Sequence, residues 1–133
     1  MADVLLATDA DWIYDDVDAA LGGDHSVYRV RQGTDVPKAM LEVDPDVVVL
    51  DLQIGNMGGM ATSLFVKQEA REARLPDAKV VMLLDRAVDD YLVTHSEADS
   101  WLVKPLDPFA LQRVVRDLLA NANESEELSQ SSD

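Results

Sequence analysis

In the segment Asp46-Val-Val-Val-Leu-Asp51-Leu-Gln-Ile-Gly-Asn-Met-Gly-Gly59, four apolar residues, three of them β-branched, lead directly into one carboxylate. Such a run between Asp-Pro-Asp and glycines is typical of a strand buried on both faces, as in parallel sheets covered by helices. The strand carries Asp51 to the carboxyl edge of the sheet, where open α/β sheets bind ligands. Asp51 is therefore a candidate site residue, and capping of the next element is the simpler alternative.

The same pattern repeats along the chain. Apolar runs predict further strands at residues 4–7, 27–30, 79–84 and 100–103. Helical spacing and capping residues predict helices at 11–21, 36–43, 59–74, 89–95 and 107–121, with Leu64 and Phe65 facing inward in the third helix. Five strands alternating with five helices predict an α/β fold, a doubly wound parallel sheet with helices on both faces.

Length and composition favour a single soluble domain. The 133 residues are 47% hydrophobic, and no apolar run approaches the roughly 18 residues of a membrane span. The first residues lack the basic and apolar regions of a signal peptide, and the chain has no cysteine, so we expect a cytoplasmic protein. After residue 121 the composition turns polar and acidic, which predicts an ordered domain at 1–121 and a disordered acidic tail at 122–133.

The net charge excludes some partners. With 26 acidic and 11 basic residues the charge is −15, so the surface should repel DNA and anionic membranes. The same excess of carboxylates favours divalent cations or a partner with a basic face.

Three charged residues follow separate predicted strands: Asp9, Asp51 and Lys104. Right-handed crossovers bring the carboxyl ends of all strands to one edge, so these side chains can meet. Two carboxylates together need a cation, and hard oxygen ligands favour Mg²⁺. A site of two aspartates, Mg²⁺ and a lysine suits an incoming phosphoryl group, whose charge is spread over several oxygens.

These residues resemble the receiver domain of two-component response regulators. The resemblance covers residues 4–121 and rests on Asp9, on the segment from Asp51 to Gly59 and on the pair Lys104-Pro105. It implies a stand-alone, chemotaxis-type receiver with the flavodoxin-like strand order 2-1-3-4-5. Asp51 would accept a phosphoryl group from a histidine kinase or phosphotransfer protein, and the protein would be no enzyme beyond self-phosphorylation and acyl-phosphate hydrolysis.

The resemblance also assigns roles within the site. Mg²⁺ would be held by Asp9, Asp51 and the backbone carbonyl of Gln53, while Lys104 would bind phosphoryl oxygens. The bond before Pro105 would be cis. Phosphorylation would change the face formed by the fourth helix, fifth strand and fifth helix, where an unidentified downstream protein binds; a homodimer through this face stays open.

Several positions depart from the receiver pattern. Thr8 stands where the first of two adjacent acids is usual, and Asp11 is a partial substitute or only a helix start. At the end of the fourth strand the usual serine or threonine is missing, because the switch candidates there are Leu84 and Asp85. An Asp85 that faces the site would repel a phosphoryl group.

Two further departures concern Gly55, where a proline is common, and Trp101, which takes the place of the switch aromatic.

These departures leave phosphorylation possible and open an alternative, a receiver-like docking module that binds its partner without phosphorylation. A flavin- or nucleotide-binding enzyme would share the architecture. However, the loop after the first strand is acidic and lacks the glycines of a phosphate-binding loop. An aspartate-based phosphatase would need a second general acid beside Asp51 and a cap segment, and the sequence indicates neither.

Overall fold

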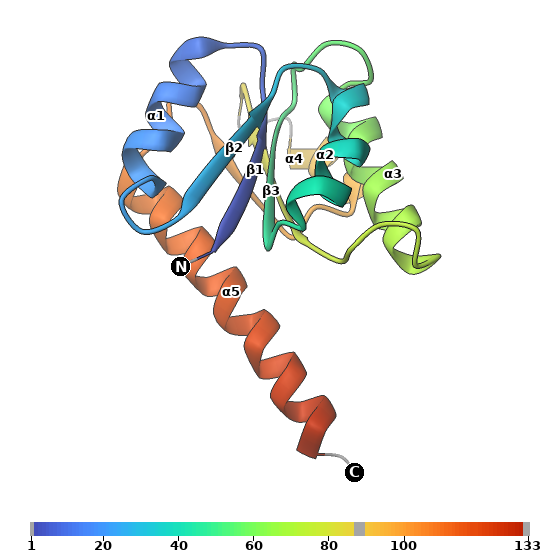
Figure 1. Cartoon of the computed structure of the whole chain (residues 1–133). Coiled ribbons are helices and arrows are strands. Elements are labelled where there is room, and N and C mark those ends of the chain that lie inside the picture. Colours follow the sequence, from blue (N-terminus) through green and yellow to red (C-terminus); the bar gives the residue numbers. More distant parts are fainter. Residues whose placement is uncertain (1, 87–89, 132–133) are drawn as a thin grey trace.

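A computed structural model of the chain, which describes residues 2–86 and 90–131, contains one parallel sheet of five strands in the order β2-β1-β3-β4-β5 (Figure 1). The strands are β1 (Asp3–Ala7), β2 (Ser26–Val30), β3 (Val47–Asp51), β4 (Lys79–Leu84) and β5 (Ser100–Val103). The helices are α1 (Asp11–Leu21), the 3₁₀ turn η1 (Gly33–Asp35), α2 (Val36–Val43), α3 (Gly59–Arg71), α4 (Asp90–Ser96) and α5 (Pro108–Ser131). The predicted doubly wound sheet and its strand order are therefore confirmed.

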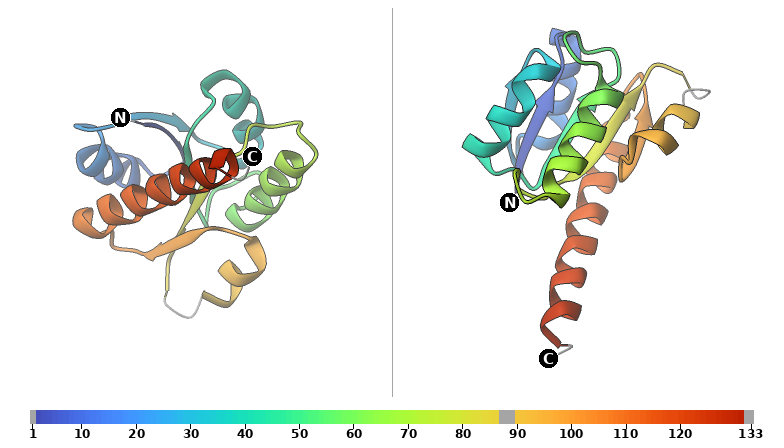
Figure 2. Two further views of the ribbon diagram at one scale, coloured as in Figure 1. Left: turned by 90° about the horizontal axis from the view of Figure 1, so that it is seen from below. Right: turned by 90° about the vertical axis from the view of Figure 1, so that its right-hand side faces the viewer.

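Helices cover both faces of the sheet and make two separate cores. One core joins α1 and α5 to the sheet through Ile13, Val17, Leu111 and Val115, while α2, α3 and α4 cover the other face (Figure 2). Every residue of β3 is buried, as the apolar run predicts. Across residues 2–86 and 90–131, no helix combines the length and apolar character needed to cross a membrane.

The inward face of α3 differs from the prediction, because Leu64 and Phe65 are partly exposed, at 36% and 41%. The buried stripe instead has the helical spacing of Gly59, Thr62, Ser63 and Val66. Small residues fit here since α3 lies close to the sheet: a Cβ atom on Gly59 would come within 2.7 Å of the Asp51 carbonyl oxygen. The prediction of Leu64 and Phe65 as core residues is wrong for this reason.

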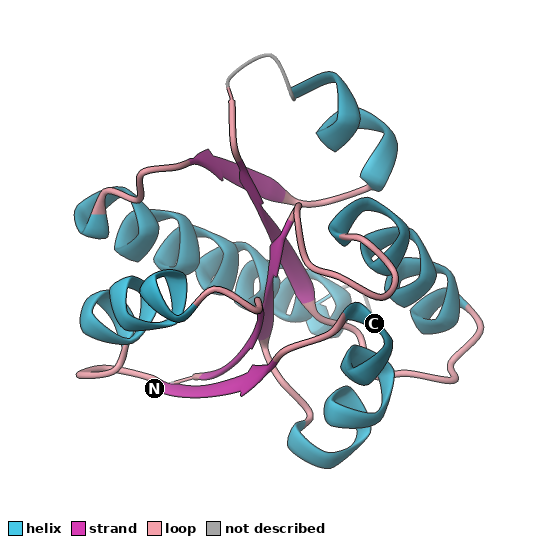
Figure 3. Ribbon diagram, turned by 90° about the horizontal axis from the view of Figure 1, so that it is seen from above, coloured by secondary structure: helices cyan, strands magenta, loops and turns pink. Residues whose placement is uncertain are grey.

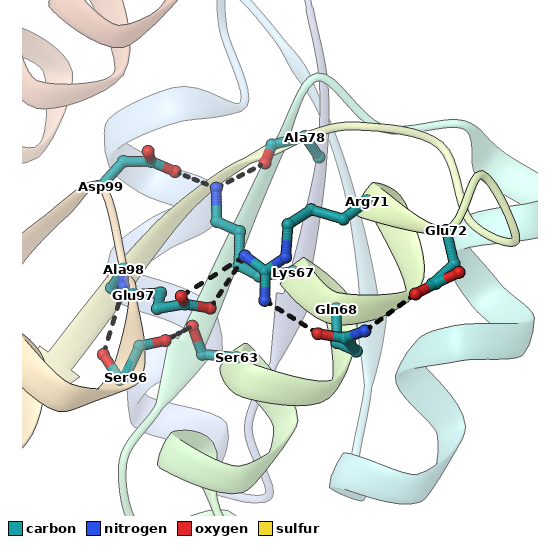
Figure 4. Close-up of polar contacts among 10 residues, drawn as sticks. All are labelled: Ser63, Lys67, Gln68, Arg71, Glu72, Ala78, Ser96, Glu97, Ala98 and Asp99. Atoms are coloured by element: carbon teal, nitrogen blue, oxygen red, sulfur yellow. Dashed lines mark hydrogen bonds and ion pairs between the residues drawn. The ribbon is translucent and has the colours of Figure 1, made fainter.

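Polar contacts fix α3 to the connection between α4 and β5 (Figure 4). The Ser63 hydroxyl donates to the Ser96 carbonyl at 2.7 Å, and Lys67 Nζ lies 2.6 Å from Asp99 Oδ2. Asp99 Oδ2 also accepts the Val80 amide of β4 at 2.7 Å. The carboxyl end of α4 is therefore tied both to α3 and to the sheet. The predicted start of this helix, at residue 89, lies outside the described residues.

Helix α5 begins as predicted and ends later. Asp107 Oδ1 accepts the Phe109 amide at 2.9 Å, an N-cap contact, and Pro108 takes the first helical position. The helix continues to Ser131, whereas the sequence predicts a disordered tail from residue 122. Its last turns project away from the sheet, and the helix formers alanine, glutamate and leucine at 122–128 support this continuation (Figures 1 and 2). The tail thus differs from the prediction in secondary structure, although it lies apart from the packed domain.

The loop after β3 is held by η1 through two main-chain hydrogen bonds. The Gly33 amide donates to the Gly55 carbonyl at 3.0 Å, and the Thr34 amide donates to the Asn56 carbonyl at 2.9 Å. Gly33 leaves no room for a side chain, since a Cβ atom there would lie 1.8 Å from the Met57 carbonyl oxygen. A glycine two elements earlier therefore determines the shape of the loop that follows Asp51.

Replacing Gly33 should destabilise the fold, and the matched control is Gly23, around which a Cβ atom would meet nothing within 4 Å. We expect Gly33→Ala to lower the free energy of unfolding by about 1–3 kcal/mol, the usual cost of overpacking, as measured by urea denaturation. Gly23→Ala should leave the midpoint nearly unchanged. Equal midpoints for the two variants would contradict the close packing at Gly33.

Candidate functional site

Four polar side chains lie at the carboxyl ends of neighbouring strands, the edge of the sheet that Figure 3 shows from above. Thr8 follows β1, Asp51 ends β3, Asp85 follows β4 and Lys104 follows β5. Strand pairing aligns Ala7 with Leu50 and Leu84 with Val103. The residue that follows each of these four therefore lies beside its counterpart on the neighbouring strand. Thr8 comes beside Asp51, and Asp85 comes beside Lys104.

The Asp51 carboxylate is the centre of this cluster. Its side chain is 3% exposed and accepts three hydrogen bonds. Oδ1 accepts Lys104 Nζ at 2.6 Å and the Gln53 amide at 3.0 Å, while Oδ2 accepts the Thr8 hydroxyl at 2.8 Å. Each carboxylate oxygen has two lone pairs, so Oδ2 retains acceptor capacity. Asp51 and Lys104, far apart in the sequence, are thus in direct contact.

Lys104 carries the positive charge of the site, and its side chain is 10% exposed. Its Nζ contacts two carboxylates, Asp51 Oδ1 at 2.6 Å and Asp85 Oδ1 at 2.9 Å. Burial alone would lower the pKa of Lys104, but the hydrogen bonds to Asp51 and Asp85 outweigh it and raise that pKa above its usual value. Lys104 therefore remains an ammonium ion at neutral pH.

Asp85 faces the site. Burial opposes ionisation of this carboxyl. Hydrogen bonding by Lys104 and the Gln53 side chain, together with the charges of Lys104 and Arg86, nevertheless holds the pKa of Asp85 below its usual value. Its Oδ2 atom is buried and has no hydrogen-bond partner among the described residues. One ammonium group is thus shared between two carboxylates.

Thr8 also belongs to the site, and the sequence does not predict its contact with Asp51. It is fully buried, and its hydroxyl oxygen also accepts the Ala10 amide at 3.1 Å, at the start of α1. The sequence marks Thr8 only as a departure from the acidic pair. The alignment of β1 with β3 would have revealed the contact with Asp51, but a single sequence does not give that alignment.

The two acids of the first loop take different positions. Asp9 is exposed, and a Cβ atom on Gly55 would lie 4.0 Å from its Oδ2, so this carboxylate faces the loop after β3. Asp11 instead pairs with Arg29 at 2.8 Å and with Arg31 at 3.3 Å. Asp11 is therefore engaged with Arg29 of β2 and Arg31 directly after it, and it does not replace the acid missing at Thr8.

The oxygen donors fit a magnesium ion with few protein ligands. Within the described residues no group of three or more histidine, cysteine, aspartate or glutamate side chains could hold a metal ion. Mg²⁺ usually keeps several waters and binds one or two carboxylates. The predicted ligands Asp9, Asp51 and the Gln53 carbonyl supply two carboxylates and one carbonyl, all hard oxygens, near the loop after β3.

The remaining predicted positions surround the cluster. Leu84 is fully buried in the core beneath α3 and α4. Its side chain has no polar group that could contact a phosphoryl group at the site. Trp101 lies on β5 and is 46% exposed. The Lys104-Pro105 peptide bond is cis, as the receiver resemblance implies.

Comparisons with known proteins agree with this architecture. No protein-family model matches the sequence. Over 83 residues the chain is 32% identical to the nitrate/nitrite response regulator protein homolog of Haemophilus influenzae, a match covering 57% of this chain and 40% of that protein. The chain thus spans less than half the length of this relative.

Solved structures extend the likeness to nearly the whole chain. Chemotaxis protein CheY4 of Vibrio cholerae matches with a TM-score of 0.76 and 21% identity, covering 89% of this chain and 98% of that chain. NtrX of Brucella abortus matches with a TM-score of 0.84 and 23% identity, covering 97% of this chain and 29% of that one. The N-terminal receiver domain of Klebsiella pneumoniae RstA matches with a TM-score of 0.76 and 21% identity, covering 88% of this chain and 97% of that chain. The protein therefore has the receiver-domain fold, and the predicted resemblance is confirmed at this level.

Removing the Thr8 hydroxyl should leave one oxygen of the buried Asp51 carboxylate without its donor. We expect Thr8→Val to lower the free energy of unfolding at pH 7 by about 1.5–3 kcal/mol, the range for hydrogen bonds to charged groups. The exposed Thr34 provides a matched control, since Thr34→Val makes the same chemical change on the surface. Urea denaturation of both variants tests this, and equal losses would contradict a special role for the Thr8 contact.

Proposed function

We propose that this chain is a receiver module of two-component signalling that accepts a phosphoryl group on Asp51. The observation that carries the proposal is the 2.6 Å contact between Lys104 Nζ and the buried Asp51 carboxylate at the carboxyl edge of the sheet. A nucleophilic carboxylate beside a fixed ammonium ion suits phosphoryl transfer, because the lysine balances charge on the transferred oxygens. The receiver fold and the response regulator relative give independent support.

In the proposed reaction an Asp51 oxygen attacks the phosphorus of a phosphohistidine on a histidine kinase or phosphotransfer protein. A phosphorus–oxygen bond forms and the phosphorus–nitrogen bond breaks, with its electron pair remaining on the imidazole nitrogen, which takes up a proton. The product is an acyl phosphate on Asp51. Water later attacks the phosphorus, which releases inorganic phosphate and restores the carboxylate.

Mg²⁺ would be held by Asp9, Asp51 and the Gln53 carbonyl, where it would supply positive charge opposite the phosphoryl oxygens. The chain's own residues perform the remaining tasks. Lys104 orients the Asp51 carboxylate and offers hydrogen bonds to a phosphoryl group. The amide of Gln53 fixes the same oxygen of Asp51 from the other side. The phosphorylated protein would then act through contacts with a downstream protein.

Phosphorylation of Asp51 is testable with a small donor. We expect incubation with acetyl phosphate and Mg²⁺ to add one phosphoryl mass to the wild type and none to Asp51→Asn, as measured by intact-mass spectrometry. Asp16→Asn, which removes an exposed carboxylate on α1, should accept the group as the wild type does. The absence of an adduct on the wild type would reject the proposal.

The metal proposal has a separate test. Asp9→Ala should weaken Mg²⁺ binding by about tenfold or more in a calorimetric titration, since the loss of even indirect metal contacts commonly costs that much. Asp16→Ala, a change of the same type outside the site, should bind as the wild type does. Identical isotherms for wild type and Asp9→Ala would remove Asp9 from the metal site.

A docking module that works without phosphorylation is the second candidate. It is favoured by the resting contacts of the site, because Thr8 already donates to Asp51 Oδ2 and Asp85 already shares Lys104. In this case the wild type would bind its partner equally well with and without acetyl phosphate, and Asp51→Asn would leave that binding unchanged.

A further inference from the structure

Asp85 gives Lys104 a second anionic partner. The Asp85 Oδ1 atom lies 2.9 Å from Lys104 Nζ, on the same ammonium group that contacts Asp51 Oδ1 at 2.6 Å. An ammonium ion has three donors, so these contacts use two of them. The position that would stabilise phosphoryl oxygens is thus partly filled by a carboxylate of the chain itself.

The Asp85 carboxylate can leave this position without unfolding the site. Its side chain is 34% exposed, against 3% for Asp51, so one side of it already meets solvent. Its Oδ2 atom is buried without a hydrogen-bond partner among the described residues, which leaves the group incompletely satisfied in its present place. Movement toward water would satisfy that atom.

We propose, on the basis of the phosphoryl transfer proposed above, that Asp85 competes with the incoming phosphoryl group for Lys104 and that its departure from Lys104 reports phosphorylation. The usual hydroxyl at the end of β4 would report by attraction to the phosphoryl group, whereas Asp85 does so by repulsion. No covalent bond changes in this step: Asp85 exchanges the Lys104 hydrogen bond for hydrogen bonds to water.

The charges of the site favour this exchange. At rest the ammonium of Lys104 contacts the two carboxylates Asp51 and Asp85, and the charge of Arg86 acts on Asp85 as well. Conversion of the Asp51 carboxylate to an acyl phosphate replaces its single negative charge with a charge of about −1.5 to −2 and adds three phosphoryl oxygens. Like charges a few ångströms apart repel strongly in a partly buried site. Asp85, the more exposed of the two carboxylates, is the group that can yield.

The test uses the phosphoryl mimic beryllofluoride with Mg²⁺, measured by fluorine NMR on four proteins. Wild type is compared with Asp85→Asn, which keeps the shape but removes the charge, and with Asp77→Asn, an exposed control just before the other end of β4. Asp51→Asn identifies binding at the site. We expect Asp85→Asn to bind about tenfold more tightly than wild type, the value of one charge-assisted hydrogen bond, and Asp77→Asn to bind as wild type does.

A second readout follows the carboxylate itself. In wild type labelled with carbon-13 at aspartate, the Asp85 carboxyl resonance should move toward that of the solvated Asp77 when beryllofluoride binds. Equal affinity of wild type and Asp85→Asn, weaker binding by Asp85→Asn, or an unmoved Asp85 resonance would each overturn the inference while leaving phosphoryl acceptance intact. Failure of wild type, Asp77→Asn and Asp85→Asn alike to bind would instead reject the proposed function.

Discussion

The contact between Asp51 and Lys104 is the interaction on which the rest of the site depends. Asp51 ends a strand buried on both faces, so its charge can persist there only with nearby compensation. The compensation comes from Lys104, directly after β5, with β4 between the two strands, and therefore requires the order β3-β4-β5 in the sheet. Fold and chemistry are linked at this point: the parallel topology that buries Asp51 also delivers the ammonium ion that makes the burial tolerable.

The fold could be predicted because its signals are local. An apolar run such as residues 47–50 marks a buried strand without knowledge of its neighbours, and the alternation of such runs with helical stripes restricts the topology. The inward face of α3 could not be predicted in the same way. Ser63 is buried where its hydroxyl donates to the carbonyl of Ser96, a contact with a residue 33 positions away that exists only in the assembled domain. Thr62 is buried beside it, and its hydroxyl donates locally to the carbonyls of Met57 and Gly58.

The same limit applies to the candidate site. Asp51 and Lys104 are visible in the sequence because each follows an apolar strand, and their charges are complementary. The contacts of Thr8 and Asp85 depend instead on strand alignment, which places Thr8 beside Asp51 and Asp85 beside Lys104. A sequence pattern shows that Thr8 and Asp85 are unusual, but the pairing of the strands decides which atoms they touch.

Two main-chain hydrogen bonds from η1 fix the loop after β3, so the loop stays ordered although Gly55 stands where a proline is common. A proline ring would restrict the loop by limiting its conformations before folding. Here the loop is restricted only in the folded protein, where the amides of Gly33 and Thr34 donate to the carbonyls of Gly55 and Asn56. This restraint uses only main-chain atoms. The loop is also held by Ile54, which is buried in the core, and Asn56 and Met57 adopt positive φ angles. The backbone beside the acidic centre is thus held from two directions, by the amides of η1 and by the burial of Ile54 beneath the helices.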